Sequence, residues 1–157
     1  MLRCYEGIAT TIVDRHSKFT LMKKVPSKHT YEVTKATLEL MRRIKQHTLT
    51  ITSDNGKEFA YHKKILKALA TGFYFAYPYR SYERGLNEHT NGLMREYFPK
   101  KGEFQYITDT QIVDVQNRLN GRPRKTLGYK TPAEVFFVQL RNLIKQHDCC
   151  CTLYLNW

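Results

Sequence analysis

Asp54 stands at the end of a short apolar run, in the sequence Thr52-Ser53-Asp54-Asn55-Gly56. The run at 49–52 is predicted to be a strand, and a carboxylate at the end of a strand lies where open α/β sheets place their ligands. Mg²⁺ takes oxygen ligands, and proteins usually supply only one or two carboxylates to it. The position therefore suits a divalent cation. Asp-Asn-Gly is also a strong turn signal, so an ordinary turn is the second interpretation of the same residues.

Glu88 is a second candidate, on a helix predicted over residues 83–97. At about 100° per residue, the apolar face of this helix holds Leu86, Thr90, Leu93, Met94 and Tyr97. A polar stripe on the opposite side holds Arg84, Glu88, Asn91 and Arg95. A carboxylate, an amide and two guanidiniums on one stripe can bind a metal and steer phosphates. The alternative is an ordinary solvent-exposed face on which Glu88 forms an ion pair with a neighbouring arginine.

Metal-dependent phosphoryl transfer on nucleic acid needs ions that hold both the attacking and the leaving oxygen, and a pair of ions needs several shared carboxylates. Asp54 and Glu88 alone are too few carboxylates to hold a pair of ions, so the pattern predicts an incomplete metal site. The sequence contains no H-E-x-x-H, G-x-x-x-x-G-K-[ST], G-x-G-x-x-G or G-x-S-x-G motif. Its histidines and cysteines show no zinc-ligand spacing.

The charge balance favours a polyanionic partner. The chain has 26 lysines and arginines against 14 aspartates and glutamates, a net charge of +12. Nucleic acid is the simplest partner, and a basic domain without one is the alternative. One stretch without acids holds Arg15, Lys18, Lys23, Lys24 and Lys28. The cations of a second stretch without acids are Arg118, Arg122, Arg124, Lys125 and Lys130. This stretch is predicted to be a flexible loop that contacts phosphates. A solvated face of the protein would have the same pattern.

One mixed α/β domain must position these residues. Periodicity and turn residues predict strands at 8–13, 19–22, 49–52 and 73–76. Helices are predicted at 31–46, 58–70, 83–97, 112–119 and 132–144, the last with Thr131 as its N-cap. No run reaches the roughly 18 apolar residues of a membrane span, and the first seven residues lack the apolar stretch of a signal peptide. We therefore expect a cytoplasmic protein without a membrane partner.

Long segments of the chain resemble the IS-thirty family of insertion-sequence transposases, whose core is of the retroviral-integrase type. Residues 52–59, Thr-Ser-Asp-Asn-Gly-Lys-Glu-Phe, resemble the strand that carries the family's second catalytic carboxylate. Residues 84–95 resemble its third-carboxylate helix, and 33 residues lie between Asp54 and Glu88, as the family spacing requires. Residues 13–19 and 118–136 match as well, so the resemblance covers about residues 7–136.

The resemblance implies a ribonuclease-H-like fold, a mixed sheet flanked by helices. It implies two Mg²⁺ or Mn²⁺ ions held by an Asp-Asp-Glu triad, and in-line attack by water or a DNA 3′-hydroxyl on a phosphodiester, with DNA as the partner. Asp54 would be the second carboxylate and Glu88 the third, both catalytic and both metal ligands. Arg84, Asn91 and Arg95 would support the site or contact DNA, together with the loop cations Arg122, Arg124, Lys125 and Lys130.

The chain also departs from the family pattern. The family's first Asp lies in a Trp-Glu-x-Asp-like strand before the 13–19 hairpin, and no such segment occurs here; Asp14 matches an acid that the family does not use in catalysis. We therefore expect a core at 7–137 that is truncated at its N-terminus and lacks its first strand, between non-family residues 1–6 and a tail at 138–157. An unpaired strand edge would leave it marginally stable or drive homo-oligomer formation. The expected function is a transposase core inactive alone, and the alternative is a non-catalytic nucleic-acid-binding module.

Overall fold

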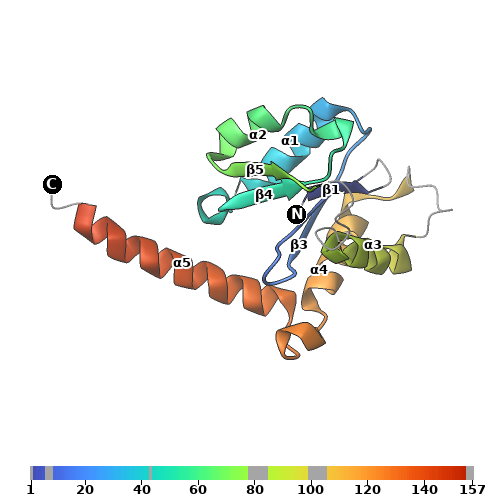
Figure 1. Ribbon diagram of the computed structural model, residues 1–157. Coiled ribbons are helices and arrows are strands. Elements are labelled where there is room, and N and C mark those ends of the chain that lie inside the picture. The colour runs from blue at the N-terminus through green and yellow to red at the C-terminus, as the bar shows by residue number, and fades with distance from the viewer. Residues whose placement is uncertain (1, 6–8, 43, 78–84, 99–105, 155–157) are drawn as a thin grey trace.

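The computed structural model describes residues 2–5, 9–42, 44–77, 85–98 and 106–154. A five-stranded mixed sheet with strand order β3-β2-β1-β4-β5 forms its centre (Figure 1). β2 is antiparallel to both of its neighbours, β3 and β1, whereas β1, β4 and β5 run parallel to one another. The strand bounds are β1 Leu2–Tyr5, β2 Ala9–Val13, β3 Thr20–Lys24, β4 Thr50–Ser53 and β5 Gly72–Phe75.

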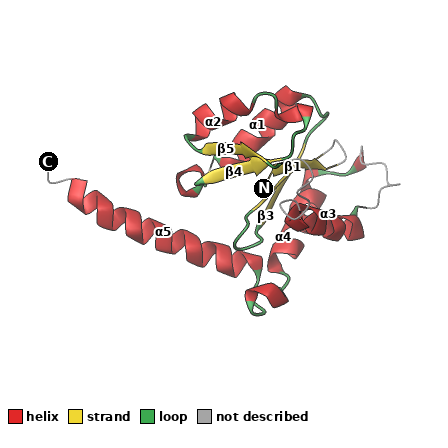
Figure 2. Ribbon diagram, viewed as in Figure 1, coloured by secondary structure: helices red, strands yellow, loops and turns green. Residues whose placement is uncertain are grey.

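Helices flank both faces of the sheet, as Figure 2 shows. The first two helices pack on one face, and α3 and α4 pack on the other, against β2 and β3. The helix bounds are α1 Thr30–Met41, α2 His62–Leu69, α3 Gly85–Tyr97, α4 Asp109–Gly121 and α5 Pro132–Tyr154. The predicted helix at 58–70 divides into a 3₁₀ turn, Lys57–Phe59, and α2. None of the described helices is both long enough and apolar enough to span a membrane.

The N-terminal strand corrects one expectation from the sequence. Leu2–Tyr5 forms β1 and pairs with β2 in the register Leu2↔Ile12 to Tyr5↔Ala9. The expectations of a missing first strand and of an unpaired β2 edge are therefore wrong, because these four residues take the place between β2 and β4. Four residues without alternation give little strand signal by themselves, and the pairing with β2 determines their conformation.

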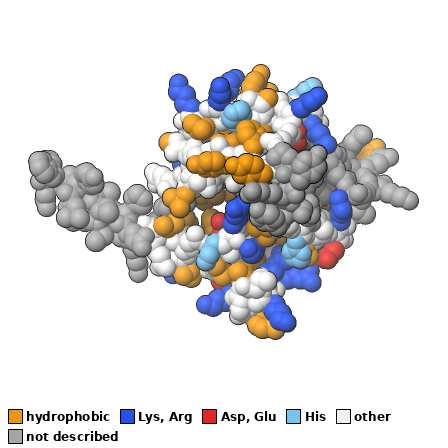
Figure 3. All heavy atoms as spheres, viewed as in Figure 1, with side chains coloured by type: hydrophobic (Ala, Val, Ile, Leu, Met, Phe, Trp, Pro, Cys, Tyr) orange, Lys and Arg blue, Asp and Glu red, His pale blue; other side chains and the backbone are white. Residues whose placement is uncertain are grey.

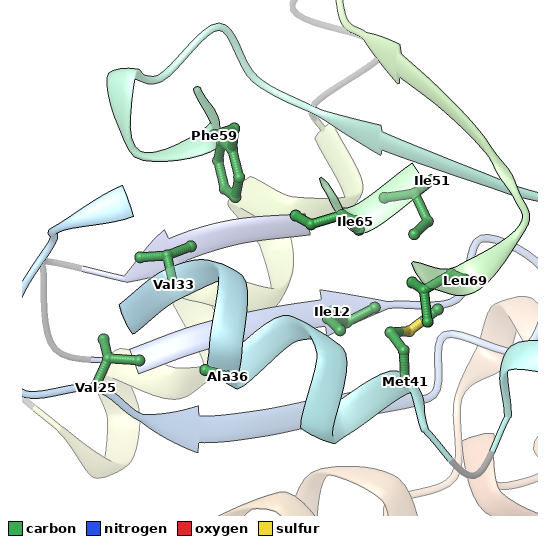
Figure 4. Close-up of a cluster of buried hydrophobic side chains, with 9 residues drawn as sticks. All are labelled: Ile12, Val25, Val33, Ala36, Met41, Ile51, Phe59, Ile65 and Leu69. Carbon is green, nitrogen blue, oxygen red and sulfur yellow. The ribbon is translucent and has the colours of Figure 1, made fainter. Parts of the chain in front are cut away.

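A cluster of apolar side chains joins the sheet to the first two helices (Figure 4). Phe59, Val33 and Ile65 are fully buried there, and Ile51 of β4 reaches the same cluster. Burying a side chain of this kind stabilises the fold by about 1.5–3 kcal/mol. The strand that leads to Asp54 is thus fixed by the burial of Ile51.

Side-chain amides of α4 close the outer edge of β3. The Asn120 Oδ1 accepts a hydrogen bond from the Thr20 N–H, and its Nδ2 donates to the Thr20 carbonyl, both at 2.8 Å. One helical turn earlier, Gln116 Oε1 accepts the Met22 N–H at 2.8 Å. Because Asn120 is buried, these amides complete the hydrogen bonding of an edge that would otherwise be open to another chain.

The helix α5 begins as the sequence predicts. The Thr131 hydroxyl accepts the Glu134 N–H at 3.2 Å, and the Glu134 carboxylate accepts the Thr131 N–H at 2.8 Å. This reciprocal cap lowers the pKa of Glu134, through the Thr131 N–H first and its hydroxyl second. The cap therefore stabilises the folded protein at pH values above the ordinary carboxyl pKa. This stabilisation is lost as the pH falls through the lowered pKa of Glu134.

A cavity of about 240 Å³ lies between β2 and β4, next to the first residue of β1. Each of the four residues of β4 pairs with β5, but only Ser53 pairs with β1. The cavity lies between the first residues of β4 and the end of β2, and Phe136 and Leu140 of α5 line it. Phe136 also stacks on Phe19 with ring centroids 4.3 Å apart, which anchors α5 to the hairpin.

Replacing Asn120 tests whether α4 holds the sheet edge. Asn120→Ala leaves the buried N–H and carbonyl of Thr20 without partners, at about 1–3 kcal/mol for each group. We expect urea denaturation to show a loss of about 3 kcal/mol in the free energy of unfolding. Asn117→Ala, at an exposed position of the same helix, is the control and should change stability by less than about 0.5 kcal/mol. Equal effects of the two variants would contradict this role of Asn120.

Candidate active site

Asp54 is the first residue after β4 and is half-buried. Hydrogen bonds on either side fix its backbone: the Ala76 N–H donates to the Ser53 carbonyl at 2.8 Å, and Asn55 Nδ2 donates to the Ala76 carbonyl at 3.2 Å. Ser53 and Ala76 are both buried. The Asp-Asn-Gly segment is a bend at Asn55 rather than a hydrogen-bonded turn, and it places a carboxylate at the end of a buried strand.

Glu88 lies in the first turn of α3. Leu86, from the same turn, lines a cavity together with Thr52 of β4 and Tyr74 of β5. The backbone that carries Glu88 therefore lies at the end of the sheet that carries Asp54.

The polar stripe expected on α3 is only partly exposed. Arg95 is exposed, but Asn91 is only 7% exposed and lies on the buried side with Thr90 and Met94. The prediction that Asn91 shares an exposed stripe with Arg95 is therefore wrong, because α3 packs against both β2 and α4 and so buries a wider arc than a single apolar face. A supporting role for Asn91 stays a prediction. Arg84 lies outside the described residues.

The loop after α4 is compact. Arg124 is half-buried and its Nη2 donates to the Leu119 carbonyl at 3.3 Å, while Arg122 Nη1 lies 3.4 Å from Glu96 Oε2. Burial lowers the pKa of Arg124, and the neighbouring Arg122 charge lowers it further. Backbone hydrogen bonds tie Arg124 to residues 129 and 130, so the expectation of a flexible loop is wrong. Lys125 and Lys130 are exposed to solvent.

Asp14 has a structural role in the hairpin between β2 and β3. Its Oδ2 accepts the Ser17 N–H at 2.8 Å and the Ser17 hydroxyl at 2.5 Å. Ser17 is fully buried, so the carboxylate satisfies groups that water does not reach. This use agrees with the prediction that Asp14 is not a substitute for the first catalytic carboxylate.

The donor set suits one metal ion better than two. Within the described part of the chain, no group of three or more His, Cys, Asp or Glu side chains could hold a metal. The four residues of β1, Leu-Arg-Cys-Tyr, include no carboxylate. Mg²⁺ can be held by one or two carboxylates with water completing its shell, whereas a pair of ions needs several shared carboxylates.

Comparison with known proteins identifies relatives of the chain. It is 46% identical over 132 residues to the transposase for insertion sequence element IS4351 of Bacteroides fragilis, which covers 84% of this chain. It is 37% identical over 126 residues to the transposase InsI for insertion sequence element IS30A of Escherichia coli, and 36% identical over 126 residues to the probable transposase for IS1161 of Streptococcus salivarius; each match covers 80% of this chain. By sequence, the chain belongs to the IS30 family of transposases.

The match covers only part of each family member. The aligned residues make up 40% of the IS4351 transposase, 33% of the IS30A transposase and 35% of the IS1161 protein. The chain therefore spans about a third to two fifths of the length of the curated IS30-family relatives it matches. No family model matches the chain.

The fold agrees with the family assignment. The solved catalytic core domain of BIV integrase superposes on this IS30-family chain with a TM-score of 0.68, at 19% sequence identity. The superposition covers 92% of this chain and 95% of that domain. The predicted ribonuclease-H-like α/β class is confirmed.

Sequence reasoning missed one part of this end of the sheet. Tyr74 and Tyr77 line the cavity beside Thr52, together with Arg15 and Lys18 from the hairpin. The aromatic residues of this segment could have signalled a binding surface, but the sequence analysis predicts only a strand at 73–76. Exposed aromatic residues on an edge strand are a signal of binding that alternation alone does not distinguish from packing.

Removing the Asn55 amide should loosen the end of the sheet that carries Asp54. Asn55→Ala loses the hydrogen bond to the Ala76 carbonyl, which should cost about 1 kcal/mol of stability. Hydrogen exchange should then be faster at the Ala76 amide, which bonds to Ser53, than in the wild-type protein. Lys57→Ala, an exposed neighbour, should leave that amide unchanged. Unaltered exchange in Asn55→Ala would show that the bond does not hold the bend.

Proposed function

We propose that this chain is the catalytic-core portion of an insertion-sequence transposase and that it binds DNA. One observation carries the proposal. Asp54 and the helical turn of Glu88 lie at the same end of a sheet whose fold is that of an integrase core. The names of the relatives, which are transposases, and the net charge of +12 support the choice of DNA as the substrate.

Asp54 and Glu88 are the residues that would hold Mg²⁺ or Mn²⁺. A divalent cation at this position would stabilise charge on the phosphodiester oxygens and lower the pKa of an attacking water. The hydrogen bonds around Asp54 would keep its carboxylate in place, and the carboxylate of Glu88 would approach from α3. Because β1 offers no third carboxylate, the chain by itself would bind DNA without cutting it at an appreciable rate.

A non-catalytic DNA-binding module is the second candidate. The absence of a three-acid cluster among the described residues favours it, together with the excess of basic residues. This candidate predicts salt-sensitive DNA binding that does not depend on Asp54. The two candidates therefore differ in whether the two carboxylates bind metal.

Metal titration separates the candidates. We expect the purified chain to bind Mn²⁺ in isothermal titration calorimetry, and Asp54→Asn or Glu88→Gln to weaken that binding by about tenfold or more, because each removes one of two charged ligands. Asp109→Asn, at the exposed start of α4, is the matched control and should bind as the wild type does. Wild-type affinity in both Asp54 and Glu88 variants would remove the metal assignment and leave the binding module.

A plasmid-nicking assay tests the expected lack of activity. With Mg²⁺ present, the chain should convert no more supercoiled DNA to open circles than the double variant Asp54→Asn, Glu88→Gln does. Nicking by the wild type that disappears in Glu88→Gln would show that the carboxylates present are sufficient for catalysis.

A further inference from the structure

A groove beside Asp54 has the composition of a nucleotide-binding surface. Its volume is about 590 Å³, and Tyr74 and Tyr77 form one wall while Arg15 and Lys18 of the β2–β3 hairpin form the other. Thr52 lies between the two walls, since it pairs with Tyr74 across β4 and β5. Figure 3 shows hydrophobic and basic side chains exposed close together on one face of the molecule.

The ring of Tyr74 provides a flat, solvent-exposed surface on β5. A β-carbon added at Gly72 would lie 2.9 Å from Cε2 of the Tyr74 ring, so the ring folds back along β5 over the glycine. Tyr74 is 59% exposed, so much of its side chain is accessible to solvent. An aromatic ring that is already fixed on a strand can stack on a base with little loss of side-chain entropy.

The hairpin supplies the positive charge. Of the basic side chains in this stretch, Lys23 forms an ion pair with Glu39, and Lys24 Nζ donates to the Ile107 carbonyl at 2.6 Å. Arg15 is exposed, and Lys18 lies beside it with its Nζ bonded to the Arg15 carbonyl at 2.5 Å. Among the described residues that line the groove none is acidic, so none of them would repel a phosphate.

We infer that this groove binds single-stranded DNA, with one base stacked on Tyr74 and the adjoining phosphates on Arg15 and Lys18. Stacking on an exposed ring requires an unpaired base, since the faces of a paired base are covered by its neighbours in the duplex. The inference rests on the proposed function for its choice of DNA. The inference adds that the DNA strand in this groove is unpaired, and it names Tyr74, Arg15 and Lys18 as the residues that bind this DNA strand.

The test measures fluorescence anisotropy of a labelled oligothymidylate of about twelve nucleotides, with the full chain and without metal. We expect Tyr74→Ala to weaken binding about tenfold, Tyr74→Phe to bind as the wild type does, and Gly72→Ala to weaken binding because it displaces the ring. Tyr31→Ala, an equally exposed tyrosine on α1, is the control. Arg15→Ala should weaken binding and lower the salt dependence by about one phosphate contact.

Three comparisons decide the outcome. If the wild type binds no DNA, the proposed function fails and this inference fails with it. Salt-dependent binding by the wild type shows that the proposed function holds. In that case, this inference alone is overturned if Tyr74→Ala has the wild-type affinity for single-stranded DNA. It is also overturned if Tyr74→Ala weakens duplex binding as much as single-strand binding. Tighter binding of an oligouridylate than of the oligothymidylate would overturn the assignment to DNA. A selective loss of single-strand affinity in Tyr74→Ala supports it.

Discussion

The arrangement of this protein depends on two amide side chains that α4 places against the edge of β3. Asn120 bonds to both backbone groups of Thr20, and Gln116 bonds to the next outward-facing N–H of the strand. These bonds join residues about a hundred positions apart in the sequence, so they fix the β2–β3 hairpin relative to the C-terminal helices. The hairpin in turn supplies Arg15 and Lys18 to the groove and Phe19 to the stack with α5. α4 also buries one side of α3, the helix that carries Glu88.

Local signals in the sequence were sufficient for most of the elements. The start of α5 was predicted correctly because Thr131 and Glu134 satisfy each other's backbone groups within one turn. The failures all depend on contacts with distant segments. β1 is a strand because β2 pairs with it, and Asn91 is buried because both β2 and α4 pack against α3. Arg124 binds a carbonyl of the helix before it, which composition alone does not reveal.

The candidate site combines opposite charges within a short distance along the sheet. Asp54 follows the end of β4, and Arg15 and Lys18 of the hairpin line the groove beside that strand together with Thr52. A polyanion lying in the groove would be neutralised along one side, and a divalent cation would shield it from the carboxylates at the end. Lys23 and Lys24 show that a basic stretch does not act as a unit, because Lys23 pairs with Glu39 and Lys24 donates to the Ile107 carbonyl, whereas Arg15 and Lys18 line the groove.

The strand pairing across the sheet is uneven. Every residue of β4 pairs with β5 and every residue of β1 pairs with β2, but among the described residues only Ser53 joins β4 to β1. Local opening of a native protein has the lowest free energy where few backbone bonds must break. The boundary between β1 and β4 is therefore the place where the parallel half of the sheet would separate first from the antiparallel half.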